Sequence, residues 1–210
     1  MEKEEGREKN VVSPLKIAVV DMGGQFNHLI YRAIIDLGEE AEMVPMTITT
    51  KELRQMAVDG VIMGGGPQRI GDRMENLGNT PNLLRELDVP VLTMCLTHQL
   101  LAIVYGGKAG PASKPEFGVI EIEVDEERDI LKGMGPRFRS IESHNDEVTV
   151  LPPVFDVLAH SKKCKVQVIQ HREKQLFGVQ FHPETMQGEK DMQLFRNFVR
   201  ICGEKKKKER

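Results

Sequence analysis

The side chain best suited to covalent chemistry is Cys95, which lies between two stretches of different periodicity. Residues 89–94 form a short apolar run, and apolar side chains after the cysteine recur at three- and four-residue spacings as far as Gly106. This pattern predicts a strand, a tight turn and a helix. The free N–H groups at the start of the helix would favour the thiolate, which is the nucleophilic form of cysteine. The alternative interpretation is that Cys95 is one more buried small apolar residue.

A histidine and a carboxylate end a second apolar run, over residues 176–181. Pro183 disfavours the helical region for His182, so we expect an extended segment in which His182 and Glu184 point to the same side. An imidazole beside a carboxylate has its tautomer fixed and its protonated form stabilised, as a general base for a thiol requires. A surface histidine beside a solvated acid is the alternative. Together with Cys95, however, the pair completes a nucleophile, a base and an orienting group.

Strands and helices alternate over the first half of the chain. The expected strands are 16–21, 42–45, 60–63 and 89–94, and the helical patterns are 25–37, 50–57 with Thr50 as its cap, and 83–87. Such alternation predicts a mostly parallel sheet with helices on both faces. Ligands of such sheets bind at the carboxyl ends of the strands, where both Cys95 and the glycines 64–66 fall. Those glycines lack a following Gly-Lys-Ser/Thr, but they can bring bare backbone N–H groups close to a substrate.

The second half of the chain alternates with a period of two. Residues 118–124, 138–142, 156–160, 166–170 and 176–181 predict antiparallel, half-exposed strands, and a helix is expected from 189 to about 201. The predicted fold class is therefore α/β. We expect three layers, with a mostly parallel central sheet, helices on both faces and an added antiparallel β segment.

Length and composition indicate one globular domain, which we place at residues 15–202 of the 210. Charge-rich residues 1–14 are expected to form a disordered leader, and residues 203–210 a charged tail. A net charge of −3 gives no field that favours nucleic acid or anionic membranes. With no membrane-spanning run and no signal peptide in the sequence, we expect a cytoplasmic protein. Three widely spaced cysteines without a CxxC pair suggest neither a disulfide framework nor a zinc site.

Three ordered motifs carry a resemblance to a known family. GGGP at 64–67, MCLTHQ at 94–99 and FHPE at 181–184 resemble the signatures of the class I, or triad, glutamine amidotransferases, and the similarity runs from about residue 16 to 202. Within this family, DMGGQ at 21–25 and ESHNDEV at 142–148 resemble the glutaminase part of GMP synthase. Because the chain has no ATP-pyrophosphatase motif of the SGGVDS type, it is similar to the separate glutaminase subunit of archaeal two-subunit GMP synthases.

The resemblance implies a role for each residue of the motifs. It implies that Cys95 is the nucleophile, that His182 is its base and later the acid, and that Glu184 orients the histidine. It further implies that the backbone N–H groups of Gly65 and Leu96 form an oxyanion hole.

The resemblance also implies the substrate, the partner and the cofactors. Gln99 and Asp146 match positions that hold the α-amino and carboxylate ends of glutamine. The ammonia would serve the amination of XMP on a separate ATP-pyrophosphatase subunit, which would bind XMP, ATP and magnesium. The chemistry implied for this chain needs no metal and no organic cofactor.

The turn around the cysteine departs from the family pattern. The family usually has glycine two residues before and two after the cysteine, where this chain has Thr93 and Thr97. We expect these β-branched residues to crowd the turn and to misdirect the Leu96 N–H in the isolated chain. Two other functions remain open: a catalytically silent regulatory or scaffold subunit, and a stand-alone γ-glutamyl cysteine hydrolase. The complete triad speaks against the first, and the 142–148 stretch speaks against the second.

Overall fold

One nine-stranded sheet organises the molecule. The structure is a computed structural model that describes residues 13–69 and 74–208, so residues 1–12 of the expected leader lie outside the described residues. The sheet order is β2-β1-β3-β4-β9-β8-β7-β5-β6. Its parallel part consists of β1 (Lys16–Asp21), β2 (Glu40–Pro45), β3 (Gly60–Met63), β4 (Val91–Met94) and β9 (Leu176–Val179).

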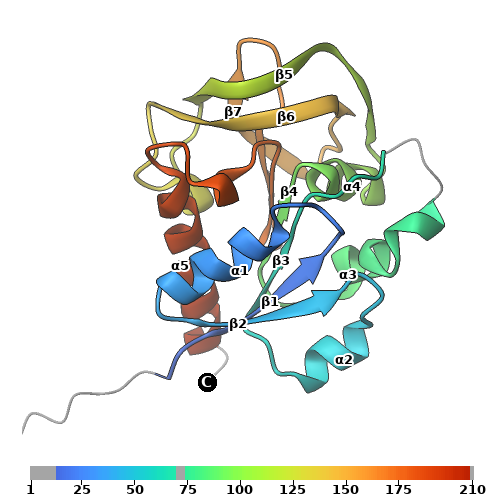
Figure 1. Cartoon of the computed structure of the whole chain (residues 1–210), viewed down its shortest axis with the longest axis vertical. Coiled ribbons are helices and arrows are strands. Elements are labelled where there is room, and N and C mark those ends of the chain that lie inside the picture. Colours follow the sequence, from blue (N-terminus) through green and yellow to red (C-terminus); the bar gives the residue numbers. More distant parts are fainter. Residues whose placement is uncertain (1–12, 70–73, 209–210) are drawn as a thin grey trace, which may run out of the picture.

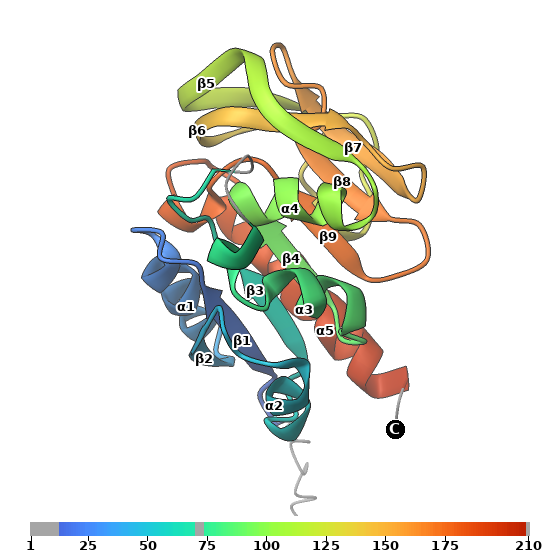
Figure 2. The ribbon, with the colours of Figure 1, turned by 90° about the vertical axis from the view of Figure 1, so that its right-hand side faces the viewer.

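The antiparallel part continues the same sheet beyond β9. It consists of β5 (Lys108–Val124), β6 (Arg137–Val150), β7 (Phe155–Ser161) and β8 (Val168–His171). The long β5–β6 ribbon lies across the top of the molecule, above the start of α4 (Leu96–Val104), and the parallel strands lie below it (Figures 1 and 2). The predicted α/β fold class is confirmed, with the antiparallel segment hydrogen-bonded into the central sheet.

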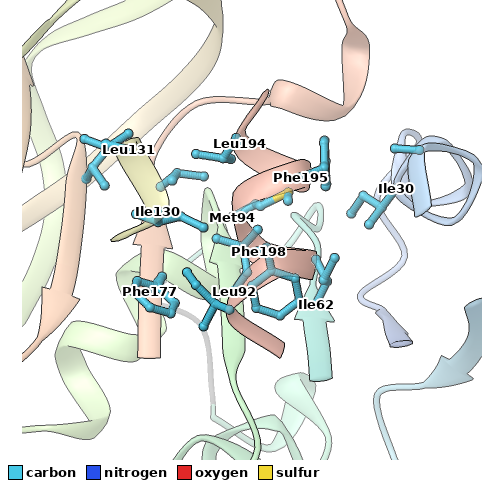
Figure 3. Close-up of a cluster of buried hydrophobic side chains, with 14 of the residues drawn as sticks. Ile30, Ile62, Leu92, Met94, Ile130, Leu131, Phe177, Leu194, Phe195 and Phe198 are labelled. Atoms are coloured by element: carbon cyan, nitrogen blue, oxygen red, sulfur yellow. The ribbon is translucent and has the colours of Figure 1, made fainter. Parts of the chain in front are cut away.

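Helices cover both faces of the parallel strands and bury two separate cores. One core lies between the sheet and the helices α1 (Asn27–Asp36) and α5 (Asp191–Lys208). In Figure 3, Phe195 and Phe198 of α5 face Leu92, Met94 and Phe177 of the central strands. The other core lies under α2 (Thr50–Gln55), α3 (Thr80–Glu86) and α4. Short 3₁₀ turns occur at Met74–Leu77, Asp129–Leu131 and Pro183–Thr185. None of the described helices is long and apolar enough to cross a membrane.

Two helix ends differ from the prediction. Thr49, not Thr50, caps α2, because the Thr49 hydroxyl accepts from the Glu52 N–H while the Glu52 carboxylate accepts from the Thr49 N–H. The last helix does not end near residue 201 but continues to residue 208. The ammonium of Lys206 lies 2.7 Å from an Asp59 carboxylate oxygen, and Lys205 donates to the Asp88 carbonyl. Residues 203–208 of the expected tail are therefore helical and attached to the loops beside them.

Candidate active site

The predicted turn between β4 and α4 is present and places Cys95 at its apex. Cys95 has φ 51° and ψ −108°, a backbone conformation that L residues rarely adopt. Its N–H donates to the Val179 carbonyl at the end of β9 (2.8 Å), and its carbonyl accepts from the Gln99 N–H (3.1 Å). These bonds anchor the strained residue between β9 and the first turn of α4, and its side chain remains partly exposed.

Thr97 does not crowd this turn but stabilises it by hydrogen bonding. Its hydroxyl accepts from the Met94 N–H (2.9 Å) and donates to the Met63 carbonyl (2.7 Å) at the end of β3. The side chain is fully buried. The first turn of α4 is thereby linked to the strand that leads into the glycine loop.

Thr93 is accommodated by a glycine on the neighbouring strand. In the parallel register of β4 and β9, Thr93 pairs with Gly178, where an added Cβ would lie only 3.0 Å from the threonine hydroxyl oxygen. That hydroxyl donates to the Phe177 carbonyl at 3.0 Å. The expectation that the two threonines crowd the turn is therefore wrong. Gly178 on β9 leaves the room that Thr93 on β4 needs.

His182 and Glu184 meet, but not through an extended backbone. Pro183–Thr185 form a 3₁₀ turn, and His182 Nδ1 lies 2.8 Å from Glu184 Oε1. The His182 N–H donates to the Ile141 carbonyl of β6 at 2.8 Å, which fixes where the chain leaves β9. The imidazole and the carboxylate are close together, as predicted, but a 3₁₀ turn brings them together and not the extended segment that we expected.

Cys95 and His182 lie side by side because β4 and β9 are neighbours in the sheet. A Cβ on Gly65 would lie 3.1 Å from His182 Cε1 and 3.6 Å from Cys95 Cβ, so the glycine loop faces both groups. Burial alone would lower the pKa of His182, but hydrogen bonds and charge from the Cys95 sulfur and the Glu184 carboxylate outweigh it and raise the pKa to about 11. The sulfur atom and the carboxylate thus both favour the protonated form of the histidine.

Two backbone donors lie next to Cys95. Gly65 is buried in the glycine loop, and Leu96 is the first residue of α4. Among the described residues, no hydrogen bond occupies the N–H of either one. Both N–H groups are available for an acceptor, as the first N–H groups of a helix generally are.

Cys95 borders two cavities. The larger, about 330 Å³, is lined by residues 23–27 with the glycine loop, His182 and Glu184. The smaller, about 160 Å³, is lined by residues 66–69, 95–96, 99 and 143–146. Sequence reasoning missed Phe26, whose ring packs edge-on against His182 (centroids 6.3 Å apart), and Ser143, which borders both cavities. Both residues lie within or next to motifs that carried the family resemblance.

Gln99 and Asp146 both line the smaller cavity, and they are bonded to each other. The Gln99 amide nitrogen donates to the Asp146 carbonyl (2.6 Å) and to the Gln180 side-chain oxygen (3.1 Å). Both amide hydrogens therefore have partners within the protein, and Gln99 holds strand β6 against α4. The expected contacts of Gln99 and Asp146 with substrate stay a prediction.

Comparison with known proteins places the chain among enzymes that act on glutamine. Residues 18–202 match the model of the family "Glutamine amidotransferase class-I". The glutamine-hydrolysing GMP synthase subunit of Pyrococcus furiosus is 43% identical over 191 residues, covering 90% of this chain and 99% of the relative. The protein of the same name from Sulfolobus acidocaldarius is 41% identical over 188 residues, with the same coverage of each chain.

Solved structures resemble the fold. The crystal structure of a putative GMP synthase subunit from Thermoplasma acidophilum superposes with a TM-score of 0.89 at 32% identity, covering 94% of this chain and 98% of that one. A glutamine amidotransferase from Thermotoga maritima superposes with a TM-score of 0.68 at 17% identity, covering 93% of this chain and 85% of that one, and supports the fold alone.

Proposed function

The chain belongs to the class I glutamine amidotransferase family, and we propose that it is the glutamine-hydrolysing subunit of a GMP synthase. In this role it releases ammonia from glutamine for the amination of XMP on a separate ATP-pyrophosphatase subunit. The observation that carries the proposal is the convergence of Cys95 with the His182–Glu184 pair at the ends of two neighbouring strands. Two relatives that match 90% of this chain are named as GMP synthase subunits, which supports XMP as the acceptor of the ammonia.

The first half-reaction forms a glutamyl thioester. The Cys95 sulfur attacks the side-chain amide carbon of glutamine, and the amide oxygen takes up negative charge between the Gly65 and Leu96 N–H groups. The C–N bond then breaks as the His182 imidazolium gives its proton to the leaving nitrogen, which departs as ammonia. Glu184 keeps the Nδ1 side of the ring oriented throughout.

The second half-reaction returns the enzyme to its starting state. His182, now neutral, takes a proton from a water molecule as that water attacks the thioester carbon. The C–S bond breaks, glutamate leaves, and Cys95 is restored beside the imidazolium. No step of this sequence calls on a metal or an organic cofactor, and in the proposal ATP and magnesium act on the partner protein.

The two cavities beside the cysteine are proposed to have different roles. The smaller one is bordered by Leu96, Gln99 and Asp146, and we assign the α-amino and carboxylate ends of glutamine to it. The Gly65 N–H lies at the larger cavity, so the amide that reacts is placed at Cys95, which borders both. The larger one is bordered by residues 23–27, His182 and Glu184, and it leaves room beside the catalytic histidine. A cytoplasmic location belongs to the same proposal.

A glutamate-release assay with the candidate ATP-pyrophosphatase subunit tests this function. The complex with XMP and ATP should form GMP from glutamine, and Cys95→Ser should abolish glutamine-dependent synthesis while leaving synthesis from added ammonium unchanged. Cys202→Ser is the matched control, because that thiol lies on the buried face of α5 and its replacement should leave both activities intact.

Each competing function predicts a different result. A silent scaffold subunit would release no glutamate under any condition, yet would still be needed for assembly. A stand-alone γ-glutamyl hydrolase would cleave γ-glutamyl peptides without the partner and would not respond to XMP. Either result would refute the proposal.

A further inference from the structure

A cluster of buried polar side chains lies outside the proposed catalytic machinery. Glu116 extends from β5, Glu142 and His144 from β6, and Cys164 from the turn between β7 and β8. The side chains of Glu116, Glu142 and His144 are at most 1% exposed, and Cys164 is 1% exposed. One donor atom each from Glu116, His144 and Cys164 lies within 4.8 Å of the other two.

The polar atoms at the centre of the cluster need a positive charge beside them. His144 Nδ1 lies 3.0 Å from the Asp146 carbonyl, and because a carbonyl only accepts, Nδ1 carries the proton. In the neutral ring the Nε2 lone pair then faces Glu116 Oε2 at 3.5 Å and Glu142 Oε2 at 3.6 Å. Among the described residues, neither Nε2 nor either Glu142 oxygen has a hydrogen-bond partner. The charge that balances the two buried carboxylates is therefore either a second proton on the His144 ring or a metal ion bound between these atoms.

The separations fit a shared metal ion better than a hydrogen bond. At 3.5–3.6 Å the nitrogen–oxygen distances exceed those of a normal hydrogen bond. Two ligand atoms that each lie about 2.0–2.1 Å from a tetrahedral zinc ion are about 3.3–3.4 Å apart, close to the observed spacing.

Outer contacts already orient the candidate ligands. Glu116 accepts hydrogen bonds from the Ser161 hydroxyl (2.8 Å) and the Gln167 amide (3.0 Å). The Cys164 N–H donates to the same Ser161 hydroxyl at 2.9 Å. Metal ligands are generally held by such hydrogen bonds, which fix the tautomer of a histidine and the rotamer of a carboxylate.

We propose that Glu116, His144 and Cys164 bind a divalent transition-metal ion of the Zn²⁺ type, with the Glu142 carboxylate next to the site. A sulfur and an imidazole nitrogen beside carboxylates favour such an ion over magnesium or calcium. Cys164 binds as the thiolate, and its proton leaves to solvent. The ion joins β5, β6 and the β7–β8 turn.

The site is structural and takes no part in glutamine hydrolysis. Through the His144–Asp146 bond the ion steadies the strand whose Asp146 carbonyl is also held by Gln99, and thus the wall of the smaller cavity. Its ligands come from β5, β6 and the β7–β8 turn, which is why the cysteine spacing in the sequence gives no sign of it.

Refolding in the presence of metal tests this site without reference to activity. The full chain is unfolded in guanidinium with a chelator, then refolded with Co²⁺ or Zn²⁺. We expect about one equivalent bound, with a thiolate-to-cobalt charge-transfer band in the Co²⁺ form. Cys164→Ser should remove the band and weaken Zn²⁺ binding about tenfold or more in competition with a chromophoric chelator. Cys202→Ser, at another buried thiol, and Cys95→Ser should keep both signals.

Three results would overturn the proposal. Binding well below one equivalent would mean that a shared proton neutralises the cluster. Loss of the band in Cys95→Ser would place the ion at the active-site thiol. Unchanged Zn²⁺ affinity in Cys164→Ser and in Glu116→Gln would exclude these ligands. Glu116→Gln serves as the second variant, and the thermal unfolding of both metal-free variants shows whether they fold.

Discussion

Thr97 is predicted to position the glycine loop through its hydroxyl group. Thr97→Val keeps the shape of the side chain but removes the oxygen, so the buried Met94 N–H loses its acceptor at 2.9 Å and the Met63 carbonyl loses its donor at 2.7 Å. Leaving such a buried group without a partner costs about 1–3 kcal/mol in the free energy of unfolding. For a domain of this size the loss corresponds to a fall of about 2–12 °C in Tm.

Turnover should fall together with stability. Met63 directly precedes the glycines, so a shift of the β3 end moves the Gly65 N–H away from the amide oxygen of glutamine. A misplacement of this kind costs up to about 100-fold in rate, because the reacting groups must be aligned within a fraction of an ångström. The KM for glutamine should change little, since the lost contact acts in the transition state.

Thermal unfolding and steady-state glutaminase assays on three variants check this reasoning. Thr97→Ser keeps the hydroxyl and should stay close to wild type in both measurements. Thr97→Gly should lower the rate, whereas a crowded turn would be relieved by glycine and the rate would rise. If Thr97→Val unfolds at the wild-type temperature and turns over glutamine normally, the hydroxyl has no positioning role and the argument fails.

The charges and burial of the site lead to three further predictions. A diazo-ketone analogue of glutamine should label Cys95 alone, because burial raises the pKa of the Cys164 and Cys202 thiols. Peptide mapping that finds the label on either of them would contradict the assignment of Cys95 as the nucleophile. Glu184→Gln should lower turnover roughly 100-fold or more and should also lower the pKa of His182. The alkaline limb of the rate–pH profile should then move to lower pH, and an unmoved limb would show that Glu184 does not raise the pKa of His182. Burial raises the pKa of Asp191 to about 7 despite its bond from Ser140, so the stability it contributes is complete below about pH 4 and is lost as the pH rises through 7. Asp191→Asn should therefore flatten the pH dependence of the urea midpoint between about pH 4 and 8, and a slope that persists would assign it to other groups.

The parallel strands and the turn at Cys95 were predictable because their signals are local. Strands β3 and β4 are buried at every position, and a continuous apolar run is what such burial requires. The sequence also contains the signal for the correct cap of α2, because a capping box places a glutamate three residues after the cap, and Glu52 has this spacing from Thr49 but not from Thr50. Proximity of His182 to Glu184 was predicted, although from an extended segment that the structure replaces with a 3₁₀ turn.

The features that sequence reasoning missed depend on contacts between distant parts of the chain. The lysines after residue 202 carry no apolar periodicity, and they remain helical because Lys206 reaches Asp59. The room for Thr93 depends on Gly178, which is adjacent only in the sheet register. The buried Glu116 cluster likewise forms only when β5 and β6 pair. None of these pairings leaves a local signal.

The position of β9 in the sheet determines when the site can first exist. The nucleophile follows β4 and its base follows β9, yet the whole antiparallel segment is synthesised between them before β9 inserts next to β4. Contacts of such sequence separation form late in folding. A nascent chain on the ribosome therefore carries Cys95 without a base until nearly all of the domain has emerged. An incomplete chain cannot consume glutamine, so ammonia is released only by molecules whose sheet has closed around β9.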